Sequence, residues 1–237
     1  MSSISLCMLT KDEEKFLEKA LSSVKEIVDE IIIVDTGSKD RTVETAKKFT
    51  NKIFFKKFEN DFSELRNFSI EKATKDWILI LDADEMISKN DLIKIKELVE
   101  NNEYLGYAFI QRTYFNKPLT KQWNYSESDS YEESKPYLGW IYRGITRLFQ
   151  NNKDIKFEYP IHETVIESIK QLNGRILNSK IPIHHYSLLR DKDSIIKKNE
   201  LYKKILKNKI RKFQKNKFIT ELKVQEEIEE VLTPQNV

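Results

Sequence analysis

The sequence predicts an α/β protein in which a mainly parallel sheet is flanked by helices, and two observations lead to that prediction. Over roughly the first 90 residues, short apolar runs alternate with segments whose apolar residues recur at helical spacing. Acidic residues gather where those apolar runs end. Ligands of open α/β sheets bind outside the carboxyl ends of the strands, so the functional site is expected at this edge.

The predicted strands are four apolar runs of strand length, at residues 4–9, 30–35, 53–55 and 77–81. Helical patterns follow the first three of them, around 16–24, from residue 41 and at 63–73. Because parallel strands need a crossover connection, usually a helix, this alternation favours parallel pairing.

Two turns contribute to the same edge. Gly37 can adopt a positive φ at no steric cost, and Ser38 or Asp40 can cap the helix that follows. Thr10 or Asp12 is expected to cap the helix after the first strand.

The most informative stretch is residues 76–85, DWILILDADE, where a buried strand delivers Asp82, Asp84 and Glu85 to its carboxyl end. Carboxylates are costly to bury unless a positive charge meets them. The natural partner here is a divalent cation that carries a phosphorylated ligand. The alternative is a polar turn that only caps the strand, since Asp-x-Asp by itself is common.

The pattern changes after residue 104. Residues 107–115 and 146–149 are predicted strands, and the segment between them, 116–143, is polar and rich in aromatic residues. Its aromatic rings either stack on a bound ligand or pack beneath the loop as a separate cluster. We expect one domain over 1–190, with halves at 1–100 and 101–190, and a basic helical extension over 191–237.

Composition argues against several classes of protein. The net charge of +3 gives no global field for nucleic acid, and 39% apolar residues suffice for a core. The single Cys7 lies in an apolar run, so it is expected to act as a small buried hydrophobe in a reducing compartment. No signal peptide, membrane-spanning run or lipidation motif is apparent, and we expect a cytoplasmic protein.

Four motifs occur in a fixed order: SLCMLTKDEE at 5–14, IIIVDTGSKDRT at 31–42, ELRN at 64–67 and WILILDADE at 77–85. Together they resemble the nucleotide-sugar half of family 2 glycosyltransferases, which have the GT-A fold. The branch that they resemble most includes lipopolysaccharide-core glucosyltransferases and bacteriocin-type peptide S-glycosyltransferases. The resemblance covers roughly residues 3–190 and is densest over the first 90.

The resemblance implies a site for a UDP-sugar. Its implied residues are Thr10, Glu13, Asp35, Gly37, Asp40, Arg66, Asp82 and Ala83. Asp35 would accept from uracil N3–H, and Glu13 and Asp40 would flank the base and ribose. Asp82 would lie near the sugar or ribose. Arg66 would lie near the diphosphate or uracil, unless it only forms an ion pair with Glu64 or Asp61.

The resemblance also implies a metal site. Asp84 would hold Mg²⁺ or Mn²⁺ between the two phosphates, and the cation would stabilise charge on the departing UDP. His185 or His184 would complete the coordination. Strand alternation places these histidines on opposite faces, so only one is expected to face the metal.

Glu163 is the predicted catalytic base, because it follows a short apolar segment and stands in the family's His-Glu position. An inverting transferase needs one carboxylate to deprotonate the attacking acceptor. His162 beside it would orient it or contact the acceptor. The alternative is an ordinary surface acid.

The basic segment 192–217 holds 11 Lys or Arg against two acids, for a net charge of +9. It is either a helix docked on the domain with a solvated face or a surface for an anionic membrane or a phosphorylated acceptor. The second interpretation would place the protein at the inner face of the membrane.

We therefore expect an inverting, metal-dependent transferase that moves a hexose, most simply glucose from UDP-glucose. The acceptor is a glycan, a lipid-linked molecule or a peptide, and no nucleic acid is involved. A sugar-1-phosphate nucleotidyltransferase is an alternative, but residues 10–14 offer no Gly-rich phosphate loop. The other alternative is a catalytically degenerate protein that binds nucleotide sugars without turning them over.

Overall fold

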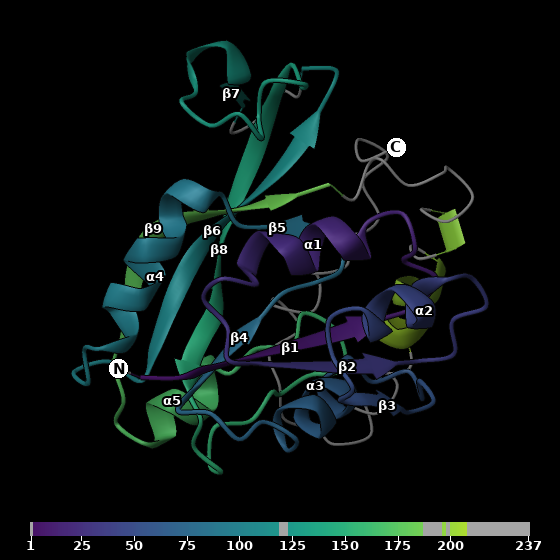
Figure 1. Cartoon of the computed structure of the whole chain (residues 1–237), viewed down its shortest axis with the longest axis vertical. Helices are drawn as coiled ribbons and strands as arrows, with labels where there is room; N and C mark the ends of the chain where they lie inside the picture. The colour runs from purple at the N-terminus through teal and green to yellow at the C-terminus, as the bar shows by residue number, and fades with distance from the viewer. Residues whose placement is uncertain (1, 119–122, 187–195, 198–199, 208–237) are drawn as a thin grey trace.

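A nine-stranded mixed sheet forms the centre of the computed structural model, which describes residues 2–118, 123–186, 196–197 and 200–207 (Figure 1). The strand order is β3-β2-β1-β4-β8-β6-β9-β5, with β7 paired to β8. The strands are β1 (Ile4–Thr10), β2 (Glu30–Asp35), β3 (Ile53–Phe55), β4 (Trp77–Ile80), β5 (Glu85–Met86), β6 (Gly106–Phe115), β7 (Asn124–Tyr125), β8 (Gly139–Gln150) and β9 (Ile176–His185). The α-helices are α1 (Leu17–Val24), α2 (Thr42–Lys47), α3 (Phe62–Ile70), α4 (Leu92–Val99) and α5 (Ile166–Gln171), and the 3₁₀ turns are η1 (Lys89–Asp91) and η2 (Ser126–Ser128).

The first half confirms the predicted parallel sheet. β1 pairs in parallel with β2 and β4, and β2 pairs in parallel with β3. The register aligns Thr10 with Asp35, so the loops after β1 and β2 start side by side. Gly37 has the expected positive φ, at 104°.

The predicted cap of α1 is wrong. α1 has no side-chain cap, because both candidate residues bind the neighbouring loop instead. The Thr10 hydroxyl donates to Asp35 (3.1 Å), and the Asp12 carboxylate accepts from the Lys39 N–H (2.7 Å). At the start of α2, Asp40 accepts from the Thr42 N–H (3.0 Å).

The second half makes the sheet mixed. β8 runs antiparallel to β4 and β6, because residues 116–138 join β6 to β8 as a long hairpin and not through a crossover helix. This hairpin projects from the body of the molecule and carries β7 (Figure 1). The predicted strand at 146–149 is the fully buried end of β8, which begins seven residues earlier, at Gly139.

Two layers of helices cover the sheet, and strand alternation decides which residues they meet. Leu6 and Met8 of β1 pack in one apolar cluster with residues of α1 and α4. Cys7 points to the other face, where its cluster includes residues of α3 and α5. Burial raises the pKa of the Cys7 thiol, as expected for a small core residue that is no nucleophile.

Residues 200–207 are helical and lie on the domain near Phe58 and Phe62. Their buried residues Ile205 and Leu206 contact Ile161, which precedes His162 and Glu163. For residues 200–207, this packing agrees with the first of the two interpretations, a helix docked on the domain. The rest of the predicted basic surface at 192–217, including 192–195, 198–199 and 208–217, lies outside the described residues. In the part of the chain that is described, no helix is long and apolar enough to span a bilayer.

Candidate active site

Asp35 ends β2 with its carboxylate fully engaged. Its oxygens accept from the backbone N–H groups of Gly37 and Ser38 (both 2.9 Å), from the Ser38 hydroxyl (2.5 Å) and from the Thr10 hydroxyl. The positive φ of Gly37 allows the turn that brings these donors together. The residue is 1% exposed, and four hydrogen bonds satisfy a charge that would otherwise be costly to bury.

The loops after β1 and β2 are joined by further hydrogen bonds. Asp40 accepts from the N–H of Glu14 (3.0 Å) and from the Thr42 hydroxyl (2.5 Å). Although burial opposes ionisation of Asp40, the hydrogen bonds from Thr42 and Glu14 lower its pKa. The Thr42 hydroxyl also accepts from the N–H of Glu13, which is buried beside this junction. Hydrogen bonds thus join the predicted nucleotide-binding residues of both loops into one cluster.

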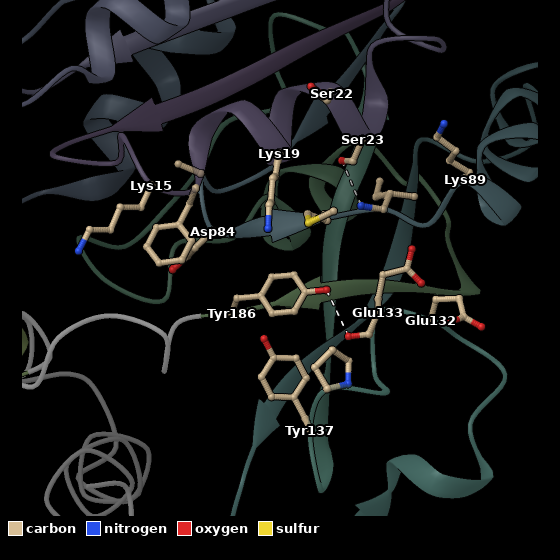
Figure 2. Close-up of a pocket in the computed structure, with 15 residues that line it drawn as sticks. Lys15, Lys19, Ser22, Ser23, Asp84, Lys89, Glu132, Glu133, Tyr137 and Tyr186 are labelled. Atoms are coloured by element: carbon tan, nitrogen blue, oxygen red, sulfur yellow. Dashed lines mark hydrogen bonds between the residues drawn. The ribbon is translucent and has the colours of Figure 1, made fainter.

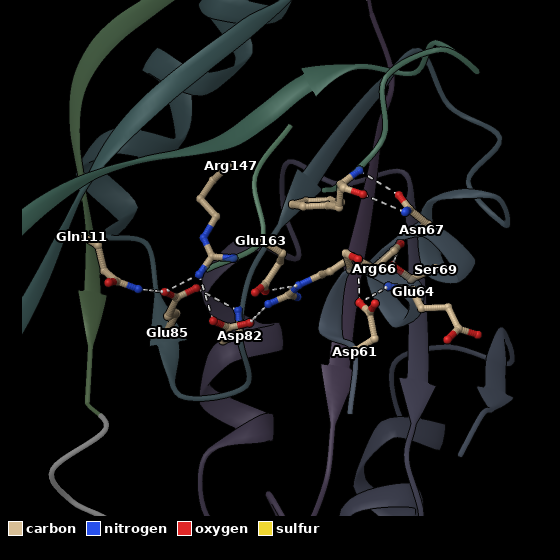
Figure 3. Close-up of polar contacts among 12 residues, drawn as sticks. Asp61, Glu64, Arg66, Asn67, Ser69, Asp82, Glu85, Gln111, Arg147 and Glu163 are labelled. Carbon is tan, nitrogen blue, oxygen red and sulfur yellow. Dashed lines mark hydrogen bonds and ion pairs between the residues drawn. The ribbon is translucent and has the colours of Figure 1, made fainter. Parts of the chain in front are cut away.

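Side chains of alternating charge form a row across the carboxyl end of β4 (Figure 3). The members of this row of charges are, in order, Glu163, Arg66, Asp82, Arg147 and Glu85. Arg66 of α3 forms ion pairs with Asp82 and with Glu163, whose Oε1 lies 3.2 Å from Nε. The alternative prediction, that Arg66 only forms an ion pair with Glu64 or Asp61, is wrong. Both carboxylates bind other groups. Asp61 accepts from the N–H of Glu64 at the start of α3, and Glu64 pairs with Lys56 (2.7 Å).

Arg147 of β8 continues the row, and sequence reasoning missed it. Its Nη2 lies 2.8 Å from Oδ2 of Asp82 and 2.9 Å from Oε1 of Glu85, which also accepts from Gln111. Burial opposes ionisation of Asp82, but the charges of Arg147 and Arg66 outweigh it and hold its pKa well below the usual range. The sequence did contain a signal for this role, since Arg147 stands in the short predicted strand from Thr146 to Phe149. An arginine buried in such a strand needs carboxylate partners.

The structure separates the two candidate histidines. β5 pairs with β9 so that His185 faces Asp84, with 3.7 Å between Nε2 and Oδ2. The Thr113 hydroxyl lies 3.0 Å from Nδ1 of His185 and orients the ring.

His184 points to the other face, into an aromatic cluster. Its Nδ1 lies 2.5 Å from the Tyr114 hydroxyl, and the two rings are parallel. Burial, followed by the charge of Arg112, lowers the pKa of His184 to about 4, so the ring is neutral at pH 7. His184 therefore lies away from Asp84, and the candidate metal pair is Asp84 with His185.

This pair fits a hard divalent cation in part. A carboxylate oxygen and an imidazole nitrogen are suitable ligands, and Asp84 is almost fully buried. Within the described ranges, no group of three or more His, Cys, Asp or Glu side chains could hold a metal ion. Any such cation would need further ligands from elsewhere. Ala83 is buried in the turn between Asp82 and Asp84.

Glu163 is no ordinary surface acid, because its side chain is only 16% exposed and contacts Arg66. Among the described residues, its Oε2 makes no hydrogen bond. The ring of His162 faces Tyr202 of the C-terminal helical segment, with 6.5 Å between centroids.

The aromatic segment of the hairpin is largely packed. Arg112 lies over the rings of Trp140 (4.0 Å) and Tyr131 (4.8 Å) and pairs with Asp129 (2.7 Å). Tyr137 stacks against Tyr114. The satellite-cluster interpretation therefore holds for these residues. Tyr125 and Tyr142 are exposed and remain available to contact a ligand.

Comparison with known proteins then identifies the chain. Residues 5–192 match the sequence profile of the family described as "Glycosyl transferase family 2". The chain belongs to glycosyltransferase family 2. Its family 2 domain thus covers most of the sequence and includes every predicted site residue from Thr10 to His185.

Relatives of this family 2 chain include a TPR repeat-containing protein of Synechococcus elongatus, 35% identical, which covers 81% of this chain and 44% of that protein. Glycosyltransferase SunS of Bacillus subtilis is 32% identical, with 68% of this chain and 34% of that protein covered. An uncharacterized glycosyltransferase of Rickettsia felis is 31% identical, with 79% and 63% covered. The chain therefore spans less than half the length of the first two of these relatives.

Solved structures confirm the GT-A type of fold for this family 2 domain. S. aureus TarS in complex with UDP-GlcNAc matches with a TM-score of 0.55 and 16% identity, over 86% of this chain and 65% of that one. Glucosyl-3-phosphoglycerate synthase of Mycobacterium tuberculosis, in complex with phosphoglyceric acid, matches with a TM-score of 0.52 and 13% identity, over 82% and 75%.

Proposed function

We propose that this chain is an inverting, metal-dependent hexosyltransferase that takes glucose from UDP-glucose and transfers it to a glycan, lipid-linked or peptide acceptor. One observation carries the proposal. The Asp35 turn, the Asp84–His185 pair and the Arg66–Glu163 ion pair lie at the carboxyl ends of neighbouring strands and the adjoining loops. A nucleotide, a diphosphate and a reacting sugar need these three kinds of group along one edge.

Asp35 is proposed to recognise the uracil base. Because four donors already occupy its oxygens, a uracil N3–H would replace one of the two hydroxyl donors, Ser38 or Thr10, since a hydroxyl can rotate away whereas the two backbone N–H groups are fixed. Glu13 and Asp40 would flank the base and ribose from the adjoining loop. The complex of the TarS fold neighbour with UDP-GlcNAc makes UDP-sugars the first donors to test.

The diphosphate is proposed to lie over the two buried arginines. Nη1 of Arg66 and Nε of Arg147 are buried and have no hydrogen-bond partner among the described residues. Orphaned guanidinium donors suit phosphate oxygens. Asp84 and His185 would hold Mg²⁺ or Mn²⁺, and the bound cation would supply Lewis-acid stabilisation of charge on UDP.

Glu163 is proposed as the base that accepts the proton of the acceptor nucleophile. Its Oε1 is held by Arg66, which fixes the carboxylate while Oε2 is left for the acceptor. Asp82 lies between the two arginines and keeps them in place. We therefore propose that Asp82 positions the arginines in addition to lying near the sugar or ribose.

A thermal-shift panel tests the donor site. UDP-, GDP-, CMP- and dTDP-sugars would each be added with and without Mn²⁺, because a ligand that binds only the native state raises its apparent stability. A shift that needs both a UDP-sugar and metal supports the proposal. A metal-dependent shift with no transfer to any acceptor would indicate the degenerate alternative, and no shift with any nucleotide sugar would overturn the proposal.

A further inference from the structure

The Glu163 segment, residues 158–164, has a strained backbone. Tyr159 and His162 have positive φ angles, of 74° and 53°, which L side chains seldom adopt. Such conformations are costly and persist only where the surrounding structure fixes them. Glu163 itself belongs to no helix or strand. The position of its carboxylate therefore depends on the contacts that hold this segment.

Backbone hydrogen bonds hold part of the Glu163 segment. Glu158 and Thr164 form a bridge in which the N–H of each donates to the carbonyl of the other, at 2.9 and 3.2 Å. The Phe62 N–H, at the start of α3, donates to the Pro160 carbonyl (2.8 Å). The two residues between Pro160 and Glu163 are held through their side chains.

The side chain of Ile161 is buried in a small apolar cluster. It is 1% exposed, and the other buried members of the cluster are Ile205 and Leu206, from the helical segment 200–207. This cluster is separate from the two larger clusters that cover the faces of the sheet. The helical segment therefore supplies both of the buried side chains against which Ile161 packs.

Aromatic contacts connect the same helical segment to the surroundings of Glu163. The Tyr202 ring meets the rings of Phe62 and His162, with 5.8 and 6.5 Å between centroids. Phe62 begins α3, the helix that also carries Arg66, the ion-pair partner of Glu163. The helical segment thus contacts both the residue before Glu163 and the helix that holds its Oε1.

We propose that the helical segment 200–207 is a clamp that positions Glu163, and that Leu206 is a positioning residue which acts through Ile161. The inference rests on the proposed role of Glu163 as the base. With the clamp in place, the strained backbone is held and the carboxylate stays beside Arg66. When the clamp loses its contacts, the backbone relaxes and the carboxylate leaves the position from which it accepts a proton.

The clamp is distinct from the cavity beside the Asp82–Asp84 turn. That cavity, of about 790 Å³, lies between α1, β5 and the hairpin segment 132–137, and Asp84 forms part of its wall (Figure 2). The described residues that line it include none from the clamp or from the Glu163 segment. Substitution of Leu206 should therefore leave the cavity and the candidate metal ligands unchanged.

The test compares the full chain with its Leu206→Ala variant. Release of UDP from UDP-glucose with Mn²⁺ is the readout, because water can replace the acceptor and lose its proton to Glu163. We expect kcat to fall about ten- to hundredfold, since a displacement of about 1 Å can have an effect of that size. KM for UDP-glucose and calorimetric binding of UDP should stay within about twofold, because the donor site is untouched. Leu206→Met, which refills the cluster, should restore kcat to within about threefold of wild type.

Two controls separate positioning from a general loss of stability. Ile95→Ala removes a buried side chain of similar size from α4 and the larger cluster, and it should leave kcat unchanged. Lys203→Ala changes the exposed face of the clamp and should also leave kcat unchanged. Circular dichroism checks that each variant is folded. A loss of kcat in Ile95→Ala equal to that in Leu206→Ala would overturn the inference.

Hydrogen exchange tests the clamp without turnover. Phe62 and Thr164 donate their backbone N–H groups to carbonyls of the Glu163 segment. Both amides should exchange more than about fivefold faster in Leu206→Ala than in wild type, because local opening becomes easier. The Gly37 amide, which donates to the Asp35 carboxylate, should exchange at the same rate in both. Unchanged exchange at Phe62 and Thr164 would overturn the inference.

A double variant separates this inference from the proposed function. If the clamp acts through Glu163, adding Leu206→Ala to Glu163→Gln should cause little further loss, because residues that act as a unit are not additive. A full further loss in the double variant, or normal kcat in Leu206→Ala, would overturn the clamp while leaving the base in place. Normal kcat in Glu163→Gln would instead overturn the proposed base.

Discussion

Glu163 lies against Arg66, with 3.2 Å between Oε1 and Nε, although 97 residues separate them along the chain. The same arginine binds Asp82, at the carboxyl end of β4. Through Arg66, the candidate base is therefore connected to the Asp82–Asp84 turn, which follows β4 and carries the candidate metal ligand. Substitution of Glu163 should affect proton transfer from the acceptor, whereas substitution of Asp84 should affect metal-dependent binding of the donor.

Glu163→Gln should leave UDP-glucose binding unchanged and reduce transfer by about 10²- to 10⁴-fold, since an amide cannot accept the acceptor's proton. The substitution keeps an oxygen for Arg66 and nearly the same shape. Transfer would be measured with radiolabelled UDP-glucose and binding by calorimetry. Glu158→Gln, five residues away along the chain, is the matched control. Normal transfer by Glu163→Gln would move the base elsewhere.

Asp84→Ala should abolish the metal-dependent part of UDP-glucose binding and leave the fold intact. The substitution removes the carboxylate that lies 3.7 Å from Nε2 of His185, whereas the backbone carbonyl of Asp84, which accepts the Tyr186 N–H, survives it. Calorimetric titrations with and without Mn²⁺ measure the effect, and circular dichroism checks the fold. Asp154→Ala, an exposed aspartate of the loop after β8, is the control. Unchanged metal-dependent binding would remove Asp84 from the metal site.

Arg147→Met should destabilise the protein by about 3–5 kcal/mol, because it leaves the carboxylates of Asp82 and Glu85 without their shared partner. Arg147→Lys should fall between wild type and Arg147→Met, because an ammonium group keeps the charge but lacks the planar fork of donors. Urea unfolding at pH 7 gives the free energy of unfolding for each variant. Equal stabilities of wild type and Arg147→Met would show that the row of charges contributes little.

Glu30 gives a prediction about acid stability. Burial opposes its ionisation, but hydrogen bonds from Lys52, Ser5 and Thr74 outweigh burial and lower its pKa from 4.5 to about 2. Because the pKa is lower in the folded state, the stabilisation is fully present above the unfolded value. It is lost as the pH falls from about 4.5 toward 2.

Glu30→Gln should therefore flatten the loss of stability over that pH range and cost up to about 3 kcal/mol at neutral pH, at about 1.4 kcal/mol per pKa unit. The measurement is the free energy of unfolding in urea from pH 7 to 2. Glu44→Gln, an exposed glutamate of α2, serves as the control. A parallel pH profile for Glu30→Gln and wild type would contradict the assignment.

The first half of the fold could be predicted because its signals are local. The strands around Cys7, Ile32 and Ile78 are buried on both faces, so they appear as continuous apolar runs. Helices with apolar stripes separate them, and the carboxyl edge follows from parallel pairing. The sequence also indicated opposite faces for His184 and His185, which the structure confirms.

The second half could not be predicted to the same extent. Only residues 146–149 of β8 are buried in succession, because the rest of the strand lies in the projecting hairpin and is partly exposed. The pairing of Arg147 with Asp82 depends on the antiparallel register between β8 and β4, which no local pattern encodes. The same holds for Arg66 and Glu163, whose contact joins two distant segments.

The position of β4 between β1 and β8 has a consequence for how this chain can be divided. All four residues of β4, from Trp77 to Ile80, are buried and apolar. A fragment ending near residue 100 would lack β8 and leave β4 as an uncovered edge with unpaired backbone groups. Such edges recruit other chains and promote aggregation. We therefore expect residues 1–100 and 101–190 to unfold together, because the sheet that joins them runs through β4 and β8.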